Sequence, residues 1–363
     1  MKNIYRIFLG ICAVAALVVV VMLLMGYRAE AGVMAVTFFI SLAIGIRGTP
    51  LKGLSFTVWI FAAVTSSMFY PKYFVELGGF QLKKLIIPLM QIIMFGMGTS
   101  MSIKDFVGVV KMPKGVFVGL LCQYTIMPFV GLGLAKSFGF PPEIAAGVVL
   151  IGASPCGLAS NVMNFIAGSN LALSITLTAV ATAIAPIMTP LMMKLLANQF
   201  IEIAFWGMMW SVVKIVIIPI VAGLTFNYLL HGKMKWLDRA MPVVSMVGIA
   251  YIITIITAAG RDGLLKIGIA LIFAAILHNT LGYFFGYWGA RLFRLDQRSC
   301  RTIAIEVGLQ NGGLASGIAL EMGKVATMGL APAVFGPWMN ISGSALANWW
   351  RSRPVKDEQP KEI

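Results

Sequence analysis

The sequence predicts an all-α polytopic membrane protein, and three observations support this prediction. Hydrophobic residues make up 59% of the 363-residue chain and charged residues only 11%, whereas a soluble domain carries about 25% charged residues. Segment after segment reaches the roughly 20 apolar residues that a helix needs to cross a bilayer. The sequence does not show the short alternating segments of a transmembrane β-barrel. Most of the surface should therefore face lipid.

Twelve apolar segments are joined by short loops, so little of the chain is left for a soluble domain. They lie near residues 5–26, 31–47, 54–70, 84–101, 115–136, 143–168, 171–197, 205–230, 240–260, 264–292, 298–322 and 327–350. The first two predict an N-terminal transmembrane hairpin within residues 1–50. Residues 351–363 are polar and charged, which predicts a disordered tail.

The N-terminal segment has a second interpretation, as a cleaved signal peptide. Lys2 and Arg6 would form its charged start, and Ala29-Glu30-Ala31 is similar to a cleavage site. The apolar run Ile7–Met25 is longer than the roughly 7–15 residues usual in such peptides. We therefore expect the hairpin to be retained.

The net charge of +15 does not indicate a nucleic-acid-binding protein. Lys and Arg concentrate in alternate loops rather than in one basic patch interleaved with aromatic residues. This is the positive-inside pattern, and it predicts a multi-pass protein of the cell membrane with both termini cytoplasmic. The four cysteines are scattered and form no C-x-x-C pair. Nothing in the sequence indicates an organic cofactor or an obligate protein partner.

An internal repeat predicts the architecture. The run Gly157-Leu158-Ala159-Ser160-Asn161 recurs as Gly313-Leu314-Ala315-Ser316-Gly317, and glycine or proline interrupts the helix in both copies. At the same separation, Gln123 stands opposite Asn279. An odd number of spans separates the copies, which reverses their orientation. This is the inverted-repeat arrangement of secondary transporters.

Glu306 is the only acidic residue that falls deep within a predicted span. An ionised carboxylate in hydrocarbon costs a few kcal/mol or more, so such a residue normally faces a cavity, a partner or an ion. A packing role, through a hydrogen bond or salt bridge between helices, is the simpler alternative. However, no basic residue lies in the same broken segment, and Gln310 and Asn311 add carbonyl oxygens. This pattern favours a site for Na⁺ or H⁺.

Two other polar residues within spans give weaker signals. Lys214 lies inside segment 205–230 and could attract an anionic substrate, but such lysines more often snorkel or line a cavity wall. His278 could titrate, although a single membrane histidine usually packs or forms a hydrogen bond. We expect neither residue to be the main determinant of function.

Five motifs follow one another in order along roughly residues 50–350. They are Ile93-Met94-Phe95-Gly96-Met97-Gly98, Gln123-Tyr124-Thr125-Ile126-Met127-Pro128, Ala159-Ser160-Asn161-Val162-Met163, Glu306-Val307-Gly308-Leu309-Gln310-Asn311 and Trp338-Met339-Asn340-Ile341-Ser342-Gly343-Ser344. Together they resemble the bile acid/sodium symporter superfamily. The asparagine-bearing break followed by the glutamate-glutamine-asparagine run is the specific part of the resemblance.

The resemblance implies a ten-helix transport domain at residues 51–350, built as two inverted five-helix repeats. A panel domain (first, second, sixth and seventh helices) would pack on a core domain in which two broken helices cross. It also implies Na⁺ as the co-transported ion. One sodium site would map to Ser160, Asn161, Ser174, Thr178 and Glu306. The other would map to Gln123, Glu306, Gln310 and the backbone carbonyls of Val307 and Leu309. Asn161, Asn311 and Asn340 would contact the substrate.

Two departures from the family pattern concern the substrate. Leu158 stands where a small hydroxyl residue is often found, and Met339 stands where some bile-acid-binding members have histidine. Leu309 replaces a common methionine, but this position would act through its backbone carbonyl. The departures therefore leave the expected sodium coupling in place and the substrate open.

These features predict a sodium-coupled symporter of a bile-acid-like, steroid-like or small carboxylate anion, working by alternating access in the lipid bilayer. A cation/proton antiporter with crossed helices, using Glu306 as the proton carrier, is the alternative, although such carriers usually place another acidic residue at the crossing. A membrane-embedded enzyme is a further alternative. The chain has no H-E-x-x-H motif and no intramembrane aspartate pair, so we do not expect an enzyme.

Overall fold

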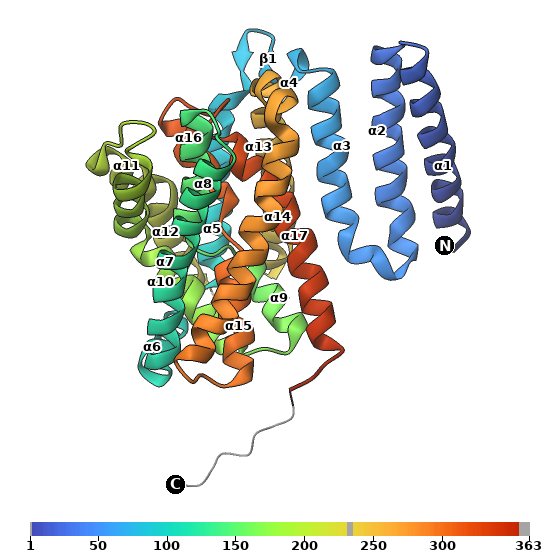
Figure 1. Ribbon diagram of the computed structural model, residues 1–363. Coiled ribbons are helices and arrows are strands. Elements are labelled where there is room, and N and C mark those ends of the chain that lie inside the picture. Colours follow the sequence, from blue (N-terminus) through green and yellow to red (C-terminus); the bar gives the residue numbers. More distant parts are fainter. Residues whose placement is uncertain (1, 231–234, 356–363) are drawn as a thin grey trace. The chain divides into compact units, whose positions relative to one another are not determined.

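The computed structural model describes residues 2–230 and 235–355, and these are almost entirely helical (Figure 1). The helices are α1 (Lys2–Leu24), α2 (Arg28–Gly45), α3 (Ser55–Phe69), α4 (Lys72–Val75), α5 (Ile86–Ser100), α6 (Gly108–Lys111), α7 (Pro113–Ser137), α8 (Pro142–Ala153), α9 (Ala159–Ala167), α10 (Leu171–Met192), α11 (Phe205–Val212), α12 (Ile218–Leu230), α13 (Lys235–Ala259), α14 (Arg261–Leu292), α15 (Gln297–Gly308), α16 (Gly312–Glu321) and α17 (Leu330–Arg351).

Short elements connect these helices. The 3₁₀ helices are Ile46–Gly48, Pro50–Leu54, Leu82–Leu85 and Ile103–Val107, and π-helical turns cover Met193–Ala197 and Val213–Ile217. Strands β1 (Glu76–Leu77) and β2 (Phe80–Gln81) form one antiparallel pair. Most of the predicted tail, residues 356–363, lies outside the described residues.

All twelve apolar segments of the sequence are helical. Among the described residues, eight helical segments are long and apolar enough to cross a membrane. They are Ile4–Leu24, Glu30–Gly48, Leu51–Phe69, Leu82–Ser100, Pro113–Ser137, Leu171–Ala197, Phe205–Leu230 and Arg261–Leu292. Two further helices, Pro142–Ala153 and Val243–Ala259, are apolar but shorter. The predicted all-α polytopic membrane protein is confirmed.

The chain forms two compact units. Unit 1 comprises residues 1–100, 214–272 and 313–337, and unit 2 comprises residues 101–213, 273–312 and 338–363. The chain passes from one unit to the other after α5, within the π-helical turn Val213–Ile217, within α14, near the start of α16 and within α17. Every residue expected to bind sodium or substrate belongs to unit 2.

In unit 1, α1, α2 and α3 lie side by side (Figure 1), and α5 packs against α12. The apolar side chains of α1, such as Leu24, are largely exposed, as a lipid-facing helix requires. Ser67 of α3 and Thr257 of α13 share a hydrogen bond of 2.6 Å. Gly98 lets α5 approach α12 closely, because a Cβ there would meet the carbonyl oxygen of Ile220.

Unit 2 has an apolar core between α7, α10, α14 and α15. Its buried members are Val116, Val118, Cys122, Met127, Leu173, Leu177, Ala290, Cys300, Ile303 and Val307. Val307 follows Glu306 directly in α15. The core therefore holds the Glu306 segment against α7 and α10.

We expect Gly131→Ala to destabilise the protein and Gly133→Ala, in the same helix α7, to leave its stability unchanged or slightly higher. A Cβ at Gly131 would lie 2.8 Å from the carbonyl oxygen of Val148 in α8, whereas a Cβ at Gly133 would meet nothing within 4 Å. Overpacking costs about 1–3 kcal/mol, while Gly to Ala within a helix gains about 0.5–1 kcal/mol. Thermal unfolding of both variants in detergent measures the difference, and equal melting temperatures would contradict this packing.

Candidate cation site

The breaks of two interrupted spans meet in unit 2. The first consists of α8 and α9, separated by residues 154–158, and the second of α15 and α16, separated by residues 309–311. Pro155 lacks a backbone donor and Gly157 weakens a helix, so the first interruption follows from the local sequence. Both spans are broken where the sequence predicts.

The two breaks cross and pair as an isolated antiparallel bridge. The backbone N–H of Gly157 donates to the carbonyl oxygen of Leu309 at 2.9 Å. The N–H of Asn311 donates to the carbonyl oxygen of Pro155 at 2.8 Å. Unwound backbone at membrane depth is tolerated only where it is buried in protein or lines an aqueous cavity. Each break therefore supplies hydrogen-bond partners for the other.

Two buried amide side chains complete the hydrogen bonding of the breaks. Gln123 Nε2, on α7, donates to the carbonyl oxygen of Ser154 at 2.9 Å. Asn279 Nδ2, on α14, donates to the carbonyl oxygen of Gly308 at 2.7 Å. The two residues that stand in register in the sequence thus perform the same task. Each satisfies a carbonyl that an interrupted helix leaves without its usual partner.

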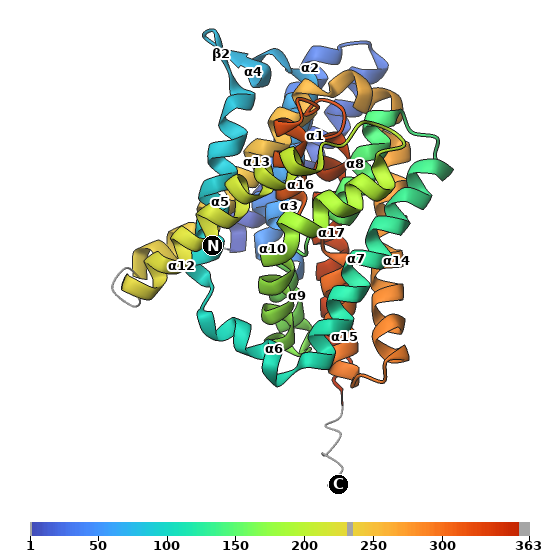
Figure 2. The same cartoon turned by 90° about the vertical axis from the view of Figure 1, so that its left-hand side faces the viewer.

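Glu306 is only 2% exposed, and three polar side chains surround its carboxylate. Ser174 Oγ lies 2.5 Å from Oε1, Thr178 Oγ1 lies 2.9 Å from Oε2, and Asn164 Nδ2 donates to Oε1 at 3.1 Å. These residues come from α9 and α10, which pack against each other and against α15 (Figure 2). The ion pairs recorded in the described part of the chain do not include Glu306. Its neighbours are therefore neutral hydroxyl and amide groups, together with the thiol of Cys156.

The hydroxyls of Ser174 and Thr178 each face two oxygen atoms. Ser174 Oγ is also 2.7 Å from Asn161 Oδ1, and Thr178 Oγ1 is 3.2 Å from the same atom. A hydroxyl has a single proton, so each hydroxyl can donate either to the amide oxygen or to the carboxylate. The remaining contact is satisfied when the Asn161 amide turns its Nδ2 toward the hydroxyls, or when a cation lies among the oxygens.

Ser160 lies at the edge of the same cluster. Its Oγ is 3.5 Å from Thr178 Oγ1 and donates to the carbonyl oxygen of Gly157 at 2.8 Å. The structure thus brings together Ser160, Asn161, Ser174, Thr178 and Glu306, the residues of the first predicted sodium site. No group of three or more His, Cys, Asp or Glu side chains that could hold a metal occurs within residues 2–230 and 235–355. One carboxylate among neutral oxygens suits a hard cation of low charge.

The residues of the second predicted site are also contiguous. Gln123 Nε2 donates to Gln310 Oε1 at 2.6 Å, and Gln310 Nε2 donates to the carbonyl oxygen of Val307 at 2.5 Å. The carbonyl of Leu309 accepts one hydrogen bond at the crossing and has a second lone pair. The hydrogen bonds of Glu306 described above all lie in the first set. The two sets are joined through the backbone of α15. Binding of sodium at either set stays a prediction.

Two of the three asparagines expected to contact substrate lie at the crossing, and the third follows a residue that contacts it. Asn161 Oδ1 belongs to the Glu306 cluster, and Asn311 lies buried within the second break. Asn340 follows Met339 in α17, and the sulfur of Met339 accepts the backbone N–H of Gln310 at 3.2 Å. Their contact with a substrate stays a prediction.

Lys214 and His278 lie apart from this cluster. Lys214 Nζ is 3.7 Å from Glu321 Oε2, at the end of α16, so the lysine has an acidic partner within unit 1. His278 is fully buried on α14, and a Cβ added at Gly152 would lie 3.1 Å from its Nε2. This tight fit supports the packing interpretation of the histidine.

Comparison with known proteins identifies the family. Residues 87–267 match the model of the Sodium Bile acid symporter family. The uncharacterized sodium-dependent transporter YocS of Bacillus subtilis (strain 168) is 38% identical over 308 residues, which cover 85% of this chain and 94% of that protein. The chain belongs to the sodium bile acid symporter family.

Plant and animal relatives agree with this assignment. The probable sodium/metabolite cotransporter BASS1 of Arabidopsis thaliana is 32% identical over 265 residues, covering 73% of this chain and 66% of the relative. The ileal sodium/bile acid cotransporter of Homo sapiens is 31% identical over 263 residues, covering 68% and 74%. As a member of this family, the chain is a sodium-dependent membrane transporter. The enzyme interpretation is excluded.

Asn164 is part of the site, and the sequence analysis missed it. The side chain is fully buried, and its Nδ2 donates to Ser174 Oγ at 2.9 Å and to Glu306. Its Oδ1 has no hydrogen-bond partner among the described residues. Asn164 follows Asn161 by three residues in α9, and residues at this spacing share a helix face. This spacing is the signal that could have identified it.

We expect Asn164→Leu to weaken sodium binding by about tenfold and Asn164→Asp to bind sodium at least as tightly as the wild type. A buried carbonyl without a partner costs about 1–3 kcal/mol, and turning the amide over would present this oxygen to a cation at Glu306. Asp keeps an oxygen at this position, whereas Leu does not. Radioactive-sodium binding to the purified variants measures the effect.

The matched control is Thr182→Val. Thr182 is buried on α10 and donates to the carbonyl oxygen of Thr178, so this variant removes a buried hydroxyl outside the cluster. Its sodium affinity should equal that of the wild type. If Asn164→Leu bound sodium as tightly as this control, Asn164 would have no role in the site.

Proposed function

We propose that this chain is a sodium-coupled secondary active symporter of an organic anion, working by alternating access. The observation that carries the proposal is the cluster of neutral oxygen atoms around the buried carboxylate of Glu306, which has no ion-pair partner among the described residues. Relatives named sodium/metabolite cotransporter and sodium/bile acid cotransporter support both the coupling ion and a small-molecule substrate.

Sodium binds at two places beside the crossing in this proposal. The first site consists of Ser160, Asn161, Ser174, Thr178 and Glu306, and the second of Gln123, Glu306, Val307, Leu309 and Gln310. A cation in the first site lies among the hydroxyl, amide and carboxylate oxygens of these residues, whose lone pairs attract it. It also compensates the only carboxylate of the cluster, which reduces the cost of holding that charge within the membrane.

The substrate binds after sodium, near Asn161, Asn311 and Asn340. The half-helices α9 and α16 begin at the two breaks, and helix N-termini attract anions because their first N–H groups are unsatisfied. This supports an organic anion, of the bile-acid, steroid or small-carboxylate type. Exchange of Leu158 or Met339 should alter substrate choice more than sodium affinity, because neither contributes an oxygen to the cation cluster.

The transport domain occupies residues 51–350 and consists of two inverted five-helix repeats, divided into panel and core domains. The equivalent hydrogen bonds of Gln123 and Asn279 at the two breaks support this symmetry. Residues 1–50 add a transmembrane hairpin, and residues 351–363 form a cytoplasmic tail. Both termini face the cytoplasm of the cell membrane, in agreement with the distribution of Lys and Arg.

The sodium gradient supplies the work of transport. A tenfold gradient provides about 1.4 kcal/mol for each ion, and the membrane potential adds about 2.3 kcal/mol per charge per 100 mV. Rocking of one domain against the other then exposes the occupied site to the opposite side of the membrane.

A cation/proton antiporter using Glu306 is the second candidate, because a proton also neutralises a buried carboxylate. The geometry favours sodium. A proton on the carboxylate makes a single hydrogen bond, whereas a cation can interact with all the oxygens that converge on it.

Uptake into proteoliposomes tests the proposal. A panel of labelled organic anions is offered with and without an inward sodium gradient to the wild type and to Glu306→Ala. We expect the wild type to accumulate at least one anion only with the gradient, and Glu306→Ala to lose this sodium-dependent uptake because the cluster loses its negative charge. The variant should remain monodisperse in detergent.

Two controls sharpen the result. Asn161→Ala should weaken apparent sodium affinity more than Lys214→Ala, because Lys214 pairs with Glu321 away from the cluster. Sodium-stimulated uptake by Glu306→Ala would refute the proposal. Uptake that ignores sodium and follows a proton gradient would favour the antiporter.

A further inference from the structure

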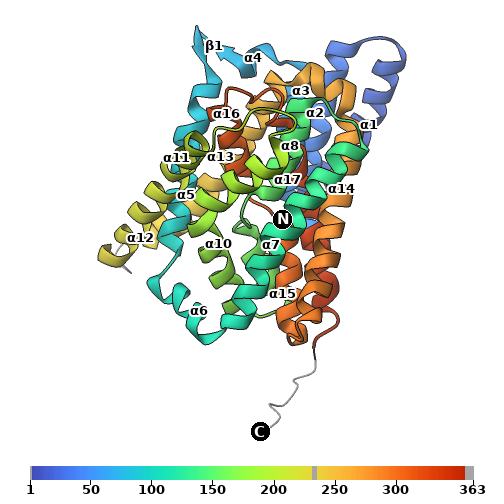
Figure 3. The ribbon, with the colours of Figure 1, turned by 60° about the vertical axis from the view of Figure 1, so that its left-hand side comes forward.

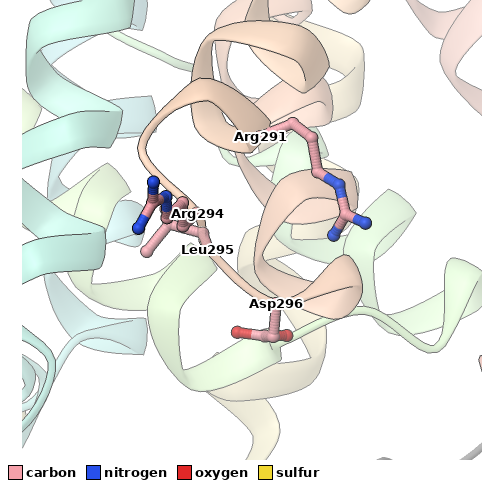
Figure 4. Close-up of a pocket in the computed structure, with 4 residues that line it drawn as sticks. All are labelled: Arg291, Arg294, Leu295 and Asp296. Carbon is pink, nitrogen blue, oxygen red and sulfur yellow. The ribbon is translucent and has the colours of Figure 1, made fainter.

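The connection between α14 and α15 carries a basic pocket of about 480 Å³ (Figure 4). It is lined by Arg291, Arg294, Leu295 and Asp296. In Figure 4, the two guanidinium groups lie on either side of the connection and the Asp296 carboxylate lies below them. Both arginines are exposed. Among the described residues, neither guanidinium makes a recorded hydrogen bond or ion pair.

The acidic residue of the pocket has another partner. Asp296 caps α15, and its Oδ1 accepts the backbone N–H of Ser299 at 2.9 Å. A carboxylate at a helix N-terminus interacts with the positive end of the helix. It is thus engaged by α15, and the two arginines remain available to an external anion.

Arg294 occupies a backbone position that glycine normally fills. Its φ is +56°, and it is the only non-glycine residue with positive φ in the described part of the chain. The N–H of Leu295 donates to the carbonyl oxygen of Ala290 at 3.2 Å, so the chain leaves α14 by a turn that favours glycine. An arginine is strained in this conformation. Strain of this kind at an exposed cation is an indication of function.

An apolar groove of about 660 Å³ begins beside this pocket. It is lined by Ile126, Phe129 and Val130 of α7 and by Phe285, Trp288, Gly289 and Leu292 of α14. The two helices run side by side (Figure 3). Leu292 is 80% exposed and Trp288 is 55% exposed, and Leu292 follows Arg291 in α14. The basic pocket and the apolar groove are therefore neighbours along the same helix.

We propose that the pocket and groove together bind one anionic phospholipid. The phosphate lies in the basic pocket lined by Arg291 and Arg294, and an acyl chain lies in the groove between α7 and α14. Basic pockets at the ends of membrane helices attract anionic headgroups, and a tryptophan one turn from such a pocket suits the depth of the membrane interface. A soluble phosphate would use the arginines but not the groove, so the apolar lining favours a lipid. This site is separate from the Glu306 cluster and does not depend on the proposed transport function.

The test uses the full chain purified in a neutral detergent and measures its melting temperature with three additives. These are dioleoyl phosphatidylglycerol, dioleoyl phosphatidylcholine and glycerol 3-phosphate. We expect phosphatidylglycerol to raise the melting temperature by about 4 °C and the other two to leave it unchanged. In the variant that combines Arg291→Ala with Arg294→Gly, the response to phosphatidylglycerol should be lost.

The variants include their own controls. Glycine suits the conformation at position 294, so Arg294→Gly alone should fold and melt without lipid at or above the wild-type temperature. Lys136→Ala removes one exposed positive charge at the other end of α7 and should keep the full response. The proposal would be overturned if phosphatidylcholine or glycerol 3-phosphate raised the melting temperature as much as phosphatidylglycerol does. It would also be overturned if phosphatidylglycerol still raised the melting temperature of the double variant, or failed to raise that of the wild type.

Discussion

The structure depends on one electrostatic constraint, which is that the carboxylate of Glu306 is buried among neutral side chains. A buried charge without a charged partner is costly. The ion pairs of the described residues do not include Glu306. The site therefore favours a compensating cation from outside the chain, which is the basis of the proposed sodium coupling.

The interrupted helices make this cluster possible. A continuous helix presents side chains at its surface and consumes its own backbone groups, whereas a broken helix frees carbonyls and N–H groups at membrane depth. Here Leu309 and Pro155 accept the N–H groups of the opposite break, and Gln123 and Asn279 donate to carbonyls at the two helix ends. Since these groups satisfy one another, the hydroxyls and amides of α9 and α10 remain free to surround Glu306.

Much of this site could be predicted from the sequence, because its signals are local or repeated. Pro155 and Gly157 interrupt a helix through their own chemistry, and the lone Glu306 stands out against an apolar background. The missed features depend on orientation or on distant contacts. Asn164 enters the cluster only because its helix presents it toward Ser174 and Glu306. The pairing of Lys214 with Glu321 joins residues far apart in the chain, and no repeating pattern of residues in the sequence predicts it. The positive φ of Arg294 is likewise a property of the turn after α14 and not of arginine.

Membership in the sodium bile acid symporter family and the geometry around Glu306 support the same proposal by independent routes. The family assignment rests on similarity along the chain, whereas the argument from Glu306 rests on a buried carboxylate among neutral oxygen atoms. The most direct test is therefore equilibrium binding of radioactive sodium to the purified chain without any substrate, compared between the wild type and Glu306→Gln. This substitution keeps the shape of the side chain and removes its charge. The account predicts saturable sodium binding in the wild type and its loss in the variant. Saturable binding of equal affinity in both would contradict it.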